Sequence, residues 1–131
     1  MKREKMINEI KKDLLKRKEI IFAYLFGSFL ENEKYNDIDI GIYIKEGTIK
    51  EEASFDYSIS LSGELSYRLG IDVDLKIMNF LPLGVVKNIL QGHLLFTRNR
   101  LFLEEYIEKK SLEYMDYFEL SKEYLKGVLS D

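Results

Sequence analysis

Two aspartates interrupt an apolar segment of this chain that has the pattern of a strand. Residues 37–44 read Asp-Ile-Asp-Ile-Gly-Ile-Tyr-Ile, so Asp37 and Asp39 alternate with isoleucines. Successive side chains of a strand point to opposite faces, which places both carboxylates on one face, about 6.6 Å apart along the strand. Aspartate is a poor strand former, and two like charges this close repel each other. A cation between them would relieve that repulsion, and carboxylate oxygens suit Mg²⁺, which completes its shell with water and phosphates.

A second segment repeats the pattern. In residues 71–77, Asp72, Asp74 and Lys76 alternate with apolar residues and therefore share a face. If this segment lies beside residues 37–44, three or four carboxylates converge on one surface. The register between the two segments decides whether they meet, and the sequence leaves it open.

A Gly-Ser pair complements the aspartates. Gly27-Ser28 follows the apolar run 20–26. A glycine after a buried strand lets the backbone approach a phosphate, and backbone N–H groups together with a serine hydroxyl can donate hydrogen bonds to anionic oxygens. The pair gains its meaning from the Asp-x-Asp strand that follows it.

Apolar periodicity predicts the elements that position these residues. The expected strands are residues 20–26, 37–44, 71–77 and, at an edge of the sheet, 93–97. The expected helices are residues 2–19, about 49–69 before Gly70, the segment between Pro82 and Gly92, and 100–129. The helix over about 49–69 takes its apolar spacing from Phe55, Ile59, Leu61, Leu65 and Leu69. This order predicts a mixed α/β (α+β) fold, a small sheet flanked by helices.

Composition limits the domain organisation and the partners. The 131 residues predict a single domain, 1–131, with a core at about 20–100 and a C-terminal helix at about 100–127. Twenty basic and 23 acidic residues give a net charge of −3 without a long block of either sign, so direct nucleic-acid binding is not expected. The absence of cysteine excludes disulfides and thiolate zinc sites. No apolar run approaches the length of a membrane span, so we expect a cytoplasmic protein without a membrane partner.

The pattern Gly27-Ser28, eight intervening residues, Asp37-Ile38-Asp39 and then Val73-Asp74-Leu75 resembles the signature of the DNA polymerase β-like nucleotidyltransferase superfamily. Within it, the chain is similar to the minimal nucleotidyltransferases over residues 20–100 or so. The resemblance implies the nucleotidyltransferase fold and ATP as substrate. It also implies two Mg²⁺ ions on the catalytic residues Asp37, Asp39 and Asp74, and nucleotide binding by Gly27 and Ser28. Asp72 is then a solvated or neighbouring carboxylate.

The resemblance further implies a partner. Many minimal nucleotidyltransferases are encoded beside a HEPN protein, a small helical RNase toxin, which they neutralise by binding and by transferring AMP to one of its tyrosines. This chain is accordingly expected to be the antitoxin of such a pair. The C-terminal helix is rich in aromatic residues that could stack an adenine, although aromatics at helical spacing more often lie in a core or an interface. We expect an interface, because a domain this small has no second lobe to close over the substrate: Tyr106, Tyr114, Tyr117, Phe118 and Tyr124.

Two other functions remain as alternatives. Transfer to a small hydroxylated molecule such as an aminoglycoside is disfavoured because no residues remain for a substrate domain. A non-catalytic antitoxin that blocks its partner sterically is disfavoured because clustered carboxylates are costly and a pure binder does not need them.

Three basic side chains near these segments have simpler roles available. His93 is the only histidine and is assigned none. Arg98 is expected in an exposed turn, with a phosphate contact as the alternative. Lys76 suits two roles equally, neutralising a carboxylate or contacting nucleotide.

Overall fold

The computed structural model describes residues 2–31 and 35–129, with side chains described for 2–29 and 35–115. Its strands are β1 (Ile20–Phe26), β2 (Asp37–Ile44), β3 (Asp72–Ile77) and β4 (His93–Thr97). Its longer helices are α1 (Arg3–Leu15), α3 (Glu51–Leu69), α4 (Leu83–Leu90) and α5 (Arg100–Leu129). A short helix, α2 (Ser28–Glu31), and a 3-10 turn, η1 (Met78–Phe80), were not predicted.

The four strands form one mixed sheet in the order β3-β2-β1-β4. β1 pairs antiparallel with β2 and with β4, and β2 pairs parallel with β3 through the crossover helix α3. The predicted mixed α/β class is confirmed, and β4 lies at an edge as expected.

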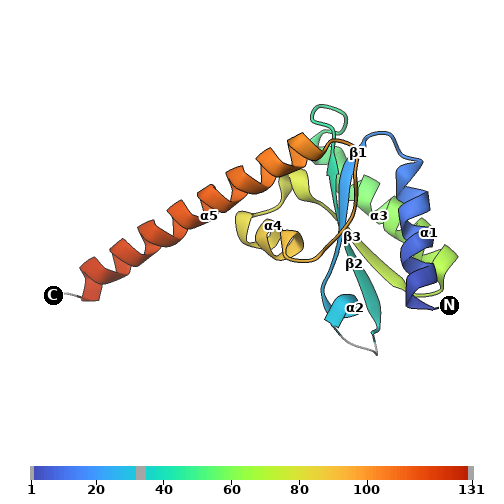
Figure 1. Cartoon of the computed structure of the whole chain (residues 1–131), viewed down its shortest axis with the longest axis horizontal. Helices are drawn as coiled ribbons and strands as arrows, with labels where there is room; N and C mark the ends of the chain where they lie inside the picture. Colours follow the sequence, from blue (N-terminus) through green and yellow to red (C-terminus); the bar gives the residue numbers. More distant parts are fainter. Residues whose placement is uncertain (1, 32–34, 130–131) are drawn as a thin grey trace.

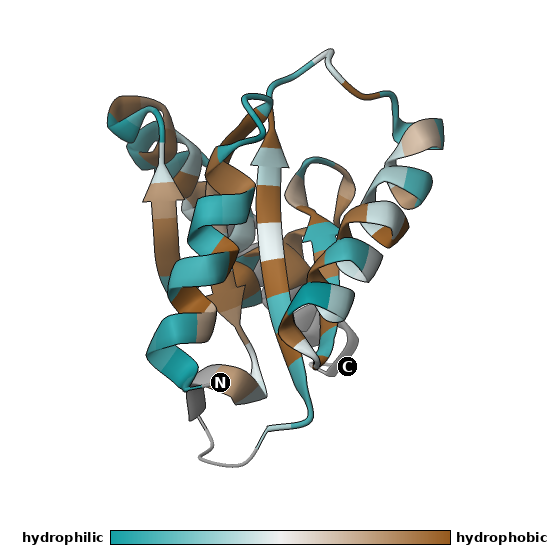
Figure 2. Cartoon of the chain, turned by 90° about the vertical axis from the view of Figure 1, so that its right-hand side faces the viewer, coloured by the Kyte–Doolittle hydropathy of each residue, from teal (hydrophilic) through white to brown (hydrophobic). Residues whose placement is uncertain are grey.

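Helices cover the sheet on both faces, as Figure 1 shows. On one face, α1 and α3 cover the isoleucines of β2; the core there includes Met6, Ile10, Leu14, Ile38, Ile40, Ile42, Leu61, Leu65 and Leu69. On the other face, α4 and α5 cover a second, more aromatic core formed by Phe22, Tyr24, Met78, Val86, Ile89, Leu103 and Tyr106. In Figure 2 the outward turns of the helices are teal, whereas the strands between them are largely brown. The two cores leave no room for a solvated strand face along the middle of the sheet.

Two helices are shorter or less buried than their sequence pattern predicts. α1 ends at Leu15 rather than at residue 19, because Lys18 follows Leu14 where the next inward-facing apolar residue would stand. In α3, only the last three residues of the predicted apolar set are buried, while Phe55 and Ile59 are 70% and 57% exposed on another side of the helix. Gly70 ends α3 in the left-handed conformation, as predicted (φ 70°).

Serines of α3 bind the outer edge of β3. The Val73 N–H donates to Ser66 Oγ (2.9 Å) and the Leu75 N–H donates to Ser62 Oγ (3.0 Å). An edge strand otherwise leaves these donors unpaired. The two hydrogen bonds fix β3, and with it Asp74, against α3.

Arg98 is exposed in the bend after β4, as expected, and it also has a structural role. Its guanidinium donates hydrogen bonds to the backbone carbonyls of Ile20, Leu15 and Arg17. It therefore holds the end of α1 and the start of β1 together.

None of the helices in the described part of the chain is both long and apolar enough to cross a membrane.

Candidate active site

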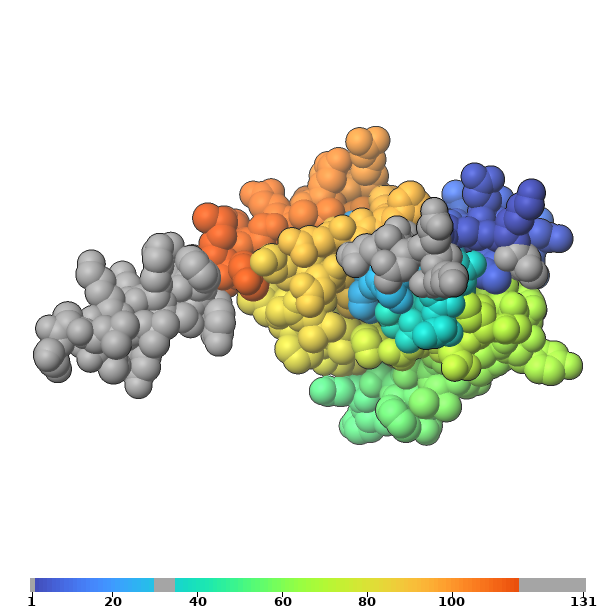
Figure 3. All heavy atoms as spheres, turned by 90° about the horizontal axis from the view of Figure 1, so that it is seen from below, coloured from blue at the N-terminus to red at the C-terminus, as the bar shows by residue number. Residues whose placement is uncertain are grey.

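The sheet face under α4 and α5 is covered at one end and open at the other. α4 packs closely on β2 at Gly41: a Cβ added to this glycine would lie only 2.6 Å from Cγ2 of Ile89 in α4. Beyond this contact β2 continues to Asp39, which is half-buried, and to Asp37, which is exposed. Figure 3 views this end of the molecule, with the cyan start of β2 at the surface between yellow α4 and the yellow-green start of β3. The open end is therefore the one that carries the carboxylates.

The parallel pairing of β2 and β3 brings the two acidic strands together. Asp37 is the register partner of Asp72, and Asp39 is the register partner of Asp74. Register partners point their side chains to the same face, as do residues two apart on one strand, so all four carboxylates lie on one face, with neighbouring strands about 4.8 Å apart. The sequence left this register open, and the structure has the arrangement in which the aspartates converge.

The surroundings of Asp39 disfavour its charged form. Burial raises the pKa of its carboxyl above the ordinary 3.8, the neighbouring charges of Asp37 and Asp74 raise it further, and Lys76 lowers it. Desolvation and like charges both disfavour an ionised carboxylate. A bound cation would therefore stabilise the ionised carboxylates of this site.

Gly27 stands directly against Asp39. Its backbone is in the left-handed region (φ 82°), and a Cβ at this position would overlap Asp39 Oδ2. Any side chain at residue 27 would therefore be strained and would displace the Asp39 carboxylate. The glycine is required both by the turn and by the closeness of the carboxylate.

Ser28 lies on the other side of the same turn. It is the first residue of α2, and its hydroxyl is 3.5 Å from Asp37 Oδ1. This distance is the outer limit of a hydrogen bond, so the hydroxyl is weakly held and available to another acceptor. Gly27 and Ser28 are thus beside the aspartates, as the sequence predicted.

Lys76 makes an ion pair with the third aspartate. Its Nζ is 3.2 Å from Asp74 Oδ2, and the two side chains are 39% and 55% exposed. Of the two roles that the sequence left open, the structure has the neutralisation of a carboxylate. The charges that raise the pKa of Asp39, after its burial, are those of Asp37 and Asp74.

The donor set is compatible with Mg²⁺, but the side chains do not form a closed metal site. Within residues 2–29 and 35–115, no three carboxylate or imidazole groups are arranged so that they could hold one ion. Mg²⁺ needs only one or two protein carboxylates when water and phosphate oxygens supply the rest. Oxygen donors, an excess of negative charge and the Lys76 ammonium already paired with Asp74 all fit a cation at this position.

Other residues singled out in the sequence lie away from this site. His93 is exposed on β4. Tyr106 is only 9% exposed and its ring packs against those of Phe22 and Tyr43, so it belongs to the core. Tyr114 is half-buried beneath the Lys87 ammonium, 4.1 Å from its ring centroid. The side chains of Tyr117, Phe118 and Tyr124 are outside the described residues.

Ser62 and Ser66 were missed in the sequence, although they hold the strand that carries Asp74. Their signal was modest: two serines four residues apart, each next to one of the leucines that face the sheet.

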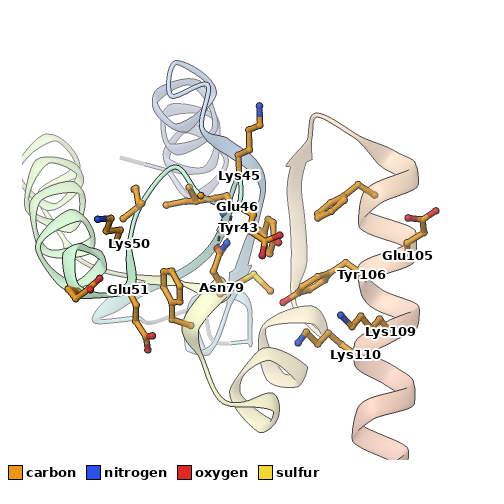
Figure 4. Close-up of a pocket in the computed structure, with 17 residues that line it drawn as sticks. Tyr43, Lys45, Glu46, Lys50, Glu51, Asn79, Glu105, Tyr106, Lys109 and Lys110 are labelled. Atoms are coloured by element: carbon orange, nitrogen blue, oxygen red, sulfur yellow. Dashed lines mark hydrogen bonds between the residues drawn. The ribbon is translucent and has the colours of Figure 1, made fainter.

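A separate cavity is at the opposite end of the sheet. It has a volume of about 850 Å³ and lies between α5, the end of β2 and the start of α3, where Figure 4 shows Tyr43, Asn79 and Tyr106 among its walls. Its rim carries four lysines and four glutamates: Lys45, Lys50, Lys109, Lys110, Glu46, Glu51, Glu52 and Glu105. This balance gives no preference for a triphosphate, and the cavity is away from the aspartates, so the open carboxylate face remains the candidate active site.

The fold and this face define a class of protein. A mixed sheet presents aspartates of two parallel neighbouring strands next to a Gly-Ser turn, and the family model for polymerase beta nucleotidyltransferases matches residues 8–101. The chain belongs to this nucleotidyltransferase family.

Solved structures extend the similarity to the whole chain. A chain in the structure of a tri-AMPylated Shewanella oneidensis HEPN toxin in complex with MNT antitoxin has a TM-score of 0.73 and 23% identity, covering 98% of this chain and 100% of the other. The toxin–antitoxin MntA-HepT gives 0.70 and 22%, covering 97% and 99%, and a toxin–antitoxin with AMP-PNP gives 0.71 and 23%, covering 94% and 99%. No curated protein sequence matches the chain. The chain therefore resembles MNT antitoxins in its entire fold.

Proposed function

We propose that this chain is a Mg²⁺-dependent nucleotidyltransferase that acts as an antitoxin, transferring AMP from ATP to a tyrosine hydroxyl of a helical HEPN-type partner. The observation that carries the proposal is the parallel register of β2 and β3, which sets Asp39 beside Asp74 on an open face next to Gly27 and Ser28. Membership of the nucleotidyltransferase family gives that face a chemistry.

In this proposal Asp37, Asp39 and Asp74 would hold two Mg²⁺ ions. When bound, such ions neutralise the triphosphate and stabilise the attacking and leaving oxygens of an in-line displacement. Ser28 would donate a hydrogen bond from its hydroxyl to a phosphate oxygen. Gly27 has no side chain that would overlap Asp39, so the phosphates would be able to approach this carboxylate.

The proposed transfer forms one bond to phosphorus, breaks another, and moves one proton to a carboxylate of this face. The tyrosine oxygen forms a bond to the α-phosphorus of ATP, the bond from that phosphorus to the β-bridging oxygen breaks, and pyrophosphate leaves. The proton of the tyrosine hydroxyl goes to a carboxylate, for which Asp74 is the candidate because it is more than half exposed and accessible to an incoming acceptor.

The choice of acceptor rests on space and on the similar proteins. The carboxylates lie on an open face rather than in an enclosed cavity, so a second macromolecule is needed to bury the acceptor. The similar structures include an AMPylated HEPN toxin in complex with MNT antitoxin and a toxin–antitoxin with AMP-PNP. Both support ATP as donor and a helical protein as acceptor for this chain.

The test is incubation with ATP, Mg²⁺ and the product of the adjacent gene, followed by intact-mass measurement of that product. Mass increases in steps of one AMP are expected with the wild type and not with Asp37→Asn. Lys45→Met, at the other end of the sheet, serves as the matched control and should transfer normally. A tight complex with unmodified partner would leave the steric antitoxin as the function, and modification of an added aminoglycoside instead would point to the small-molecule transferase.

A further inference from the structure

We propose that Lys76 is a displaceable internal counter-ion: its ammonium occupies Asp74 until a divalent cation replaces it, and then turns to the phosphates of the bound nucleotide. The first half depends only on the side chains of this face. The second half rests on the proposed nucleotidyltransferase function.

The strand holds Lys76 in the right place. Lys76 follows Asp74 by two residues on β3, so both side chains leave the same face, and Nζ reaches Asp74 Oδ2 at 3.2 Å. The amides on either side of Asp74 are bound by Ser62 and Ser66, so the backbone beneath the pair is fixed. What can move is the flexible lysine side chain.

The Lys76 ammonium offsets the negative charge of the carboxylates around it. Among the described groups that act on Asp39, the carboxylates of Asp37 and Asp74 are negative and Lys76 alone is positive. Without it, three carboxylates would face one another with no cation. In the metal-free protein, Lys76 therefore supplies the positive charge that a bound metal ion would otherwise supply to these carboxylates.

The exposure of the pair makes exchange possible. At 39% and 55% exposure, both side chains are well hydrated, and ion pairs of this kind are weak and easily broken. A divalent ion brings twice the charge of an ammonium to the same oxygens. Lysine is a point charge on a long flexible stem, which lets it leave Asp74 and approach a phosphate nearby.

The first experiment measures Mn²⁺ binding by electron paramagnetic resonance in the absence of nucleotide. Lys76→Met removes the competing ammonium, so the apparent dissociation constant for Mn²⁺ should fall about two- to fivefold, in line with the strength of exposed pairs. Lys76→Arg should bind Mn²⁺ like the wild type, and so should Lys45→Met, which removes an equal charge elsewhere. In an Asp74→Asn background, Lys76→Met should have a clearly smaller effect, because the paired carboxylate is gone and only the weaker influence of Lys76 on Asp39 remains.

The second experiment measures binding of an ATP analogue with a methylene bridge between its α- and β-phosphates, at saturating Mn²⁺. Here Lys76→Met should weaken binding about three- to tenfold, because a charged donor to the phosphates is lost. The two effects have opposite signs. A lysine with only a structural role would shift both in the same direction.

The two experiments test the counter-ion role and the phosphate contact separately. Unchanged or weaker Mn²⁺ binding in Lys76→Met overturns the counter-ion role, and unchanged binding of the analogue overturns the phosphate contact. A wild-type protein that binds Mn²⁺ as predicted but transfers no AMP would overturn the proposed function and leave the competition at Asp74 standing.

Discussion

Asp39 of β2 and Asp74 of β3 are register partners across the parallel pair of strands, so their carboxylates stand next to each other on one open face. Parallel register neighbours lie about 4.8 Å apart, close enough for like charges to repel strongly where burial limits hydration. The raised pKa of Asp39 has this origin in part, after its burial. A protein that keeps such a pair without a cation does so at a cost in stability.

Replacing Asp39 by Asn should therefore stabilise the metal-free protein while abolishing transfer. The relief of a like-charge pair across neighbouring strands is worth about 0.5–1 kcal/mol, or an increase in Tm of roughly 2–5 °C for a domain of this size. Thermal unfolding in buffer containing a chelator measures it, alongside the AMP-transfer assay. A lower Tm would show that Asp39 is held by interactions that outweigh the repulsion.

The same substitution should have a defined pH dependence. The pKa of Asp39 in the folded protein is above its ordinary value of 3.8, so its protonated form favours folding, and this stabilisation is lost as the pH rises through the folded pKa. The difference in Tm between Asp39→Asn and the wild type should be near zero below pH 3.8 and should grow to a plateau at neutral pH. Scans of Tm from pH 3 to pH 7, roughly the range over which carboxylates titrate, give the result. A difference largest in acid would reverse the sign of our assignment.

Asp74 rather than Asp72 is expected to be the third catalytic carboxylate. Asp74 is the register partner of Asp39 and acts on it, whereas Asp72 is paired with Asp37 at the outer end of the sheet. Asp74→Asn should lower the rate of transfer by about 10²–10⁴-fold, and Asp72→Asn should leave it nearly unchanged. Since both are exposed and on the same strand, the two variants control for each other in stability. An inactive Asp72 variant beside an active Asp74 variant would exchange their roles.

Gly27 should tolerate no side chain, and Gly47 provides a matched control. Both have left-handed backbones, with φ of 82° and 83°, but a Cβ at Gly47 meets nothing within 4 Å whereas one at Gly27 overlaps Asp39. Gly47→Ala should cost about 1 kcal/mol of stability, the strain of the backbone alone, and should remain active. Gly27→Ala should cost more and should reduce transfer by about 10²-fold by displacing Asp39. Equal losses in both variants would mean that the turn adapts without moving the carboxylate.

Ser66 should stabilise the edge strand that carries Asp74. Ser66→Ala removes the acceptor of the Val73 N–H and should cost about 1 kcal/mol, or roughly 3–5 °C in Tm. The control is Ser58→Ala in the same helix, whose hydroxyl donates only to the carbonyl of Phe55 within α3 and should matter little. Hydrogen exchange at the Val73 amide, faster in Ser66→Ala alone, would locate the effect on β3.

The sequence by itself determined the elements and the faces of this protein. β1 and β2 have the bounds that were predicted, and the aspartates and the isoleucines of β2 face opposite sides as their alternation requires. These features depend on side-chain period and turn residues, which are properties of a few neighbouring residues. The Gly-Ser and Asp-x-Asp pattern also indicated the family, which the family model confirms.

Tertiary structure decided the rest, because it depends on contacts between distant segments. The parallel register that sets Asp39 beside Asp74 is fixed by the packing of α3 and by its serines on β3. Ser62 is 13 residues before Leu75, whose amide it binds, so this contact is not part of the local pattern of the strand. The extent of the open face follows from the contact of Ile89 with Gly41, and the burial of Tyr106 follows from the rings of β1 and β2 beneath α5. Alternation fixes which way a side chain points, but only packing across the chain fixes what it meets.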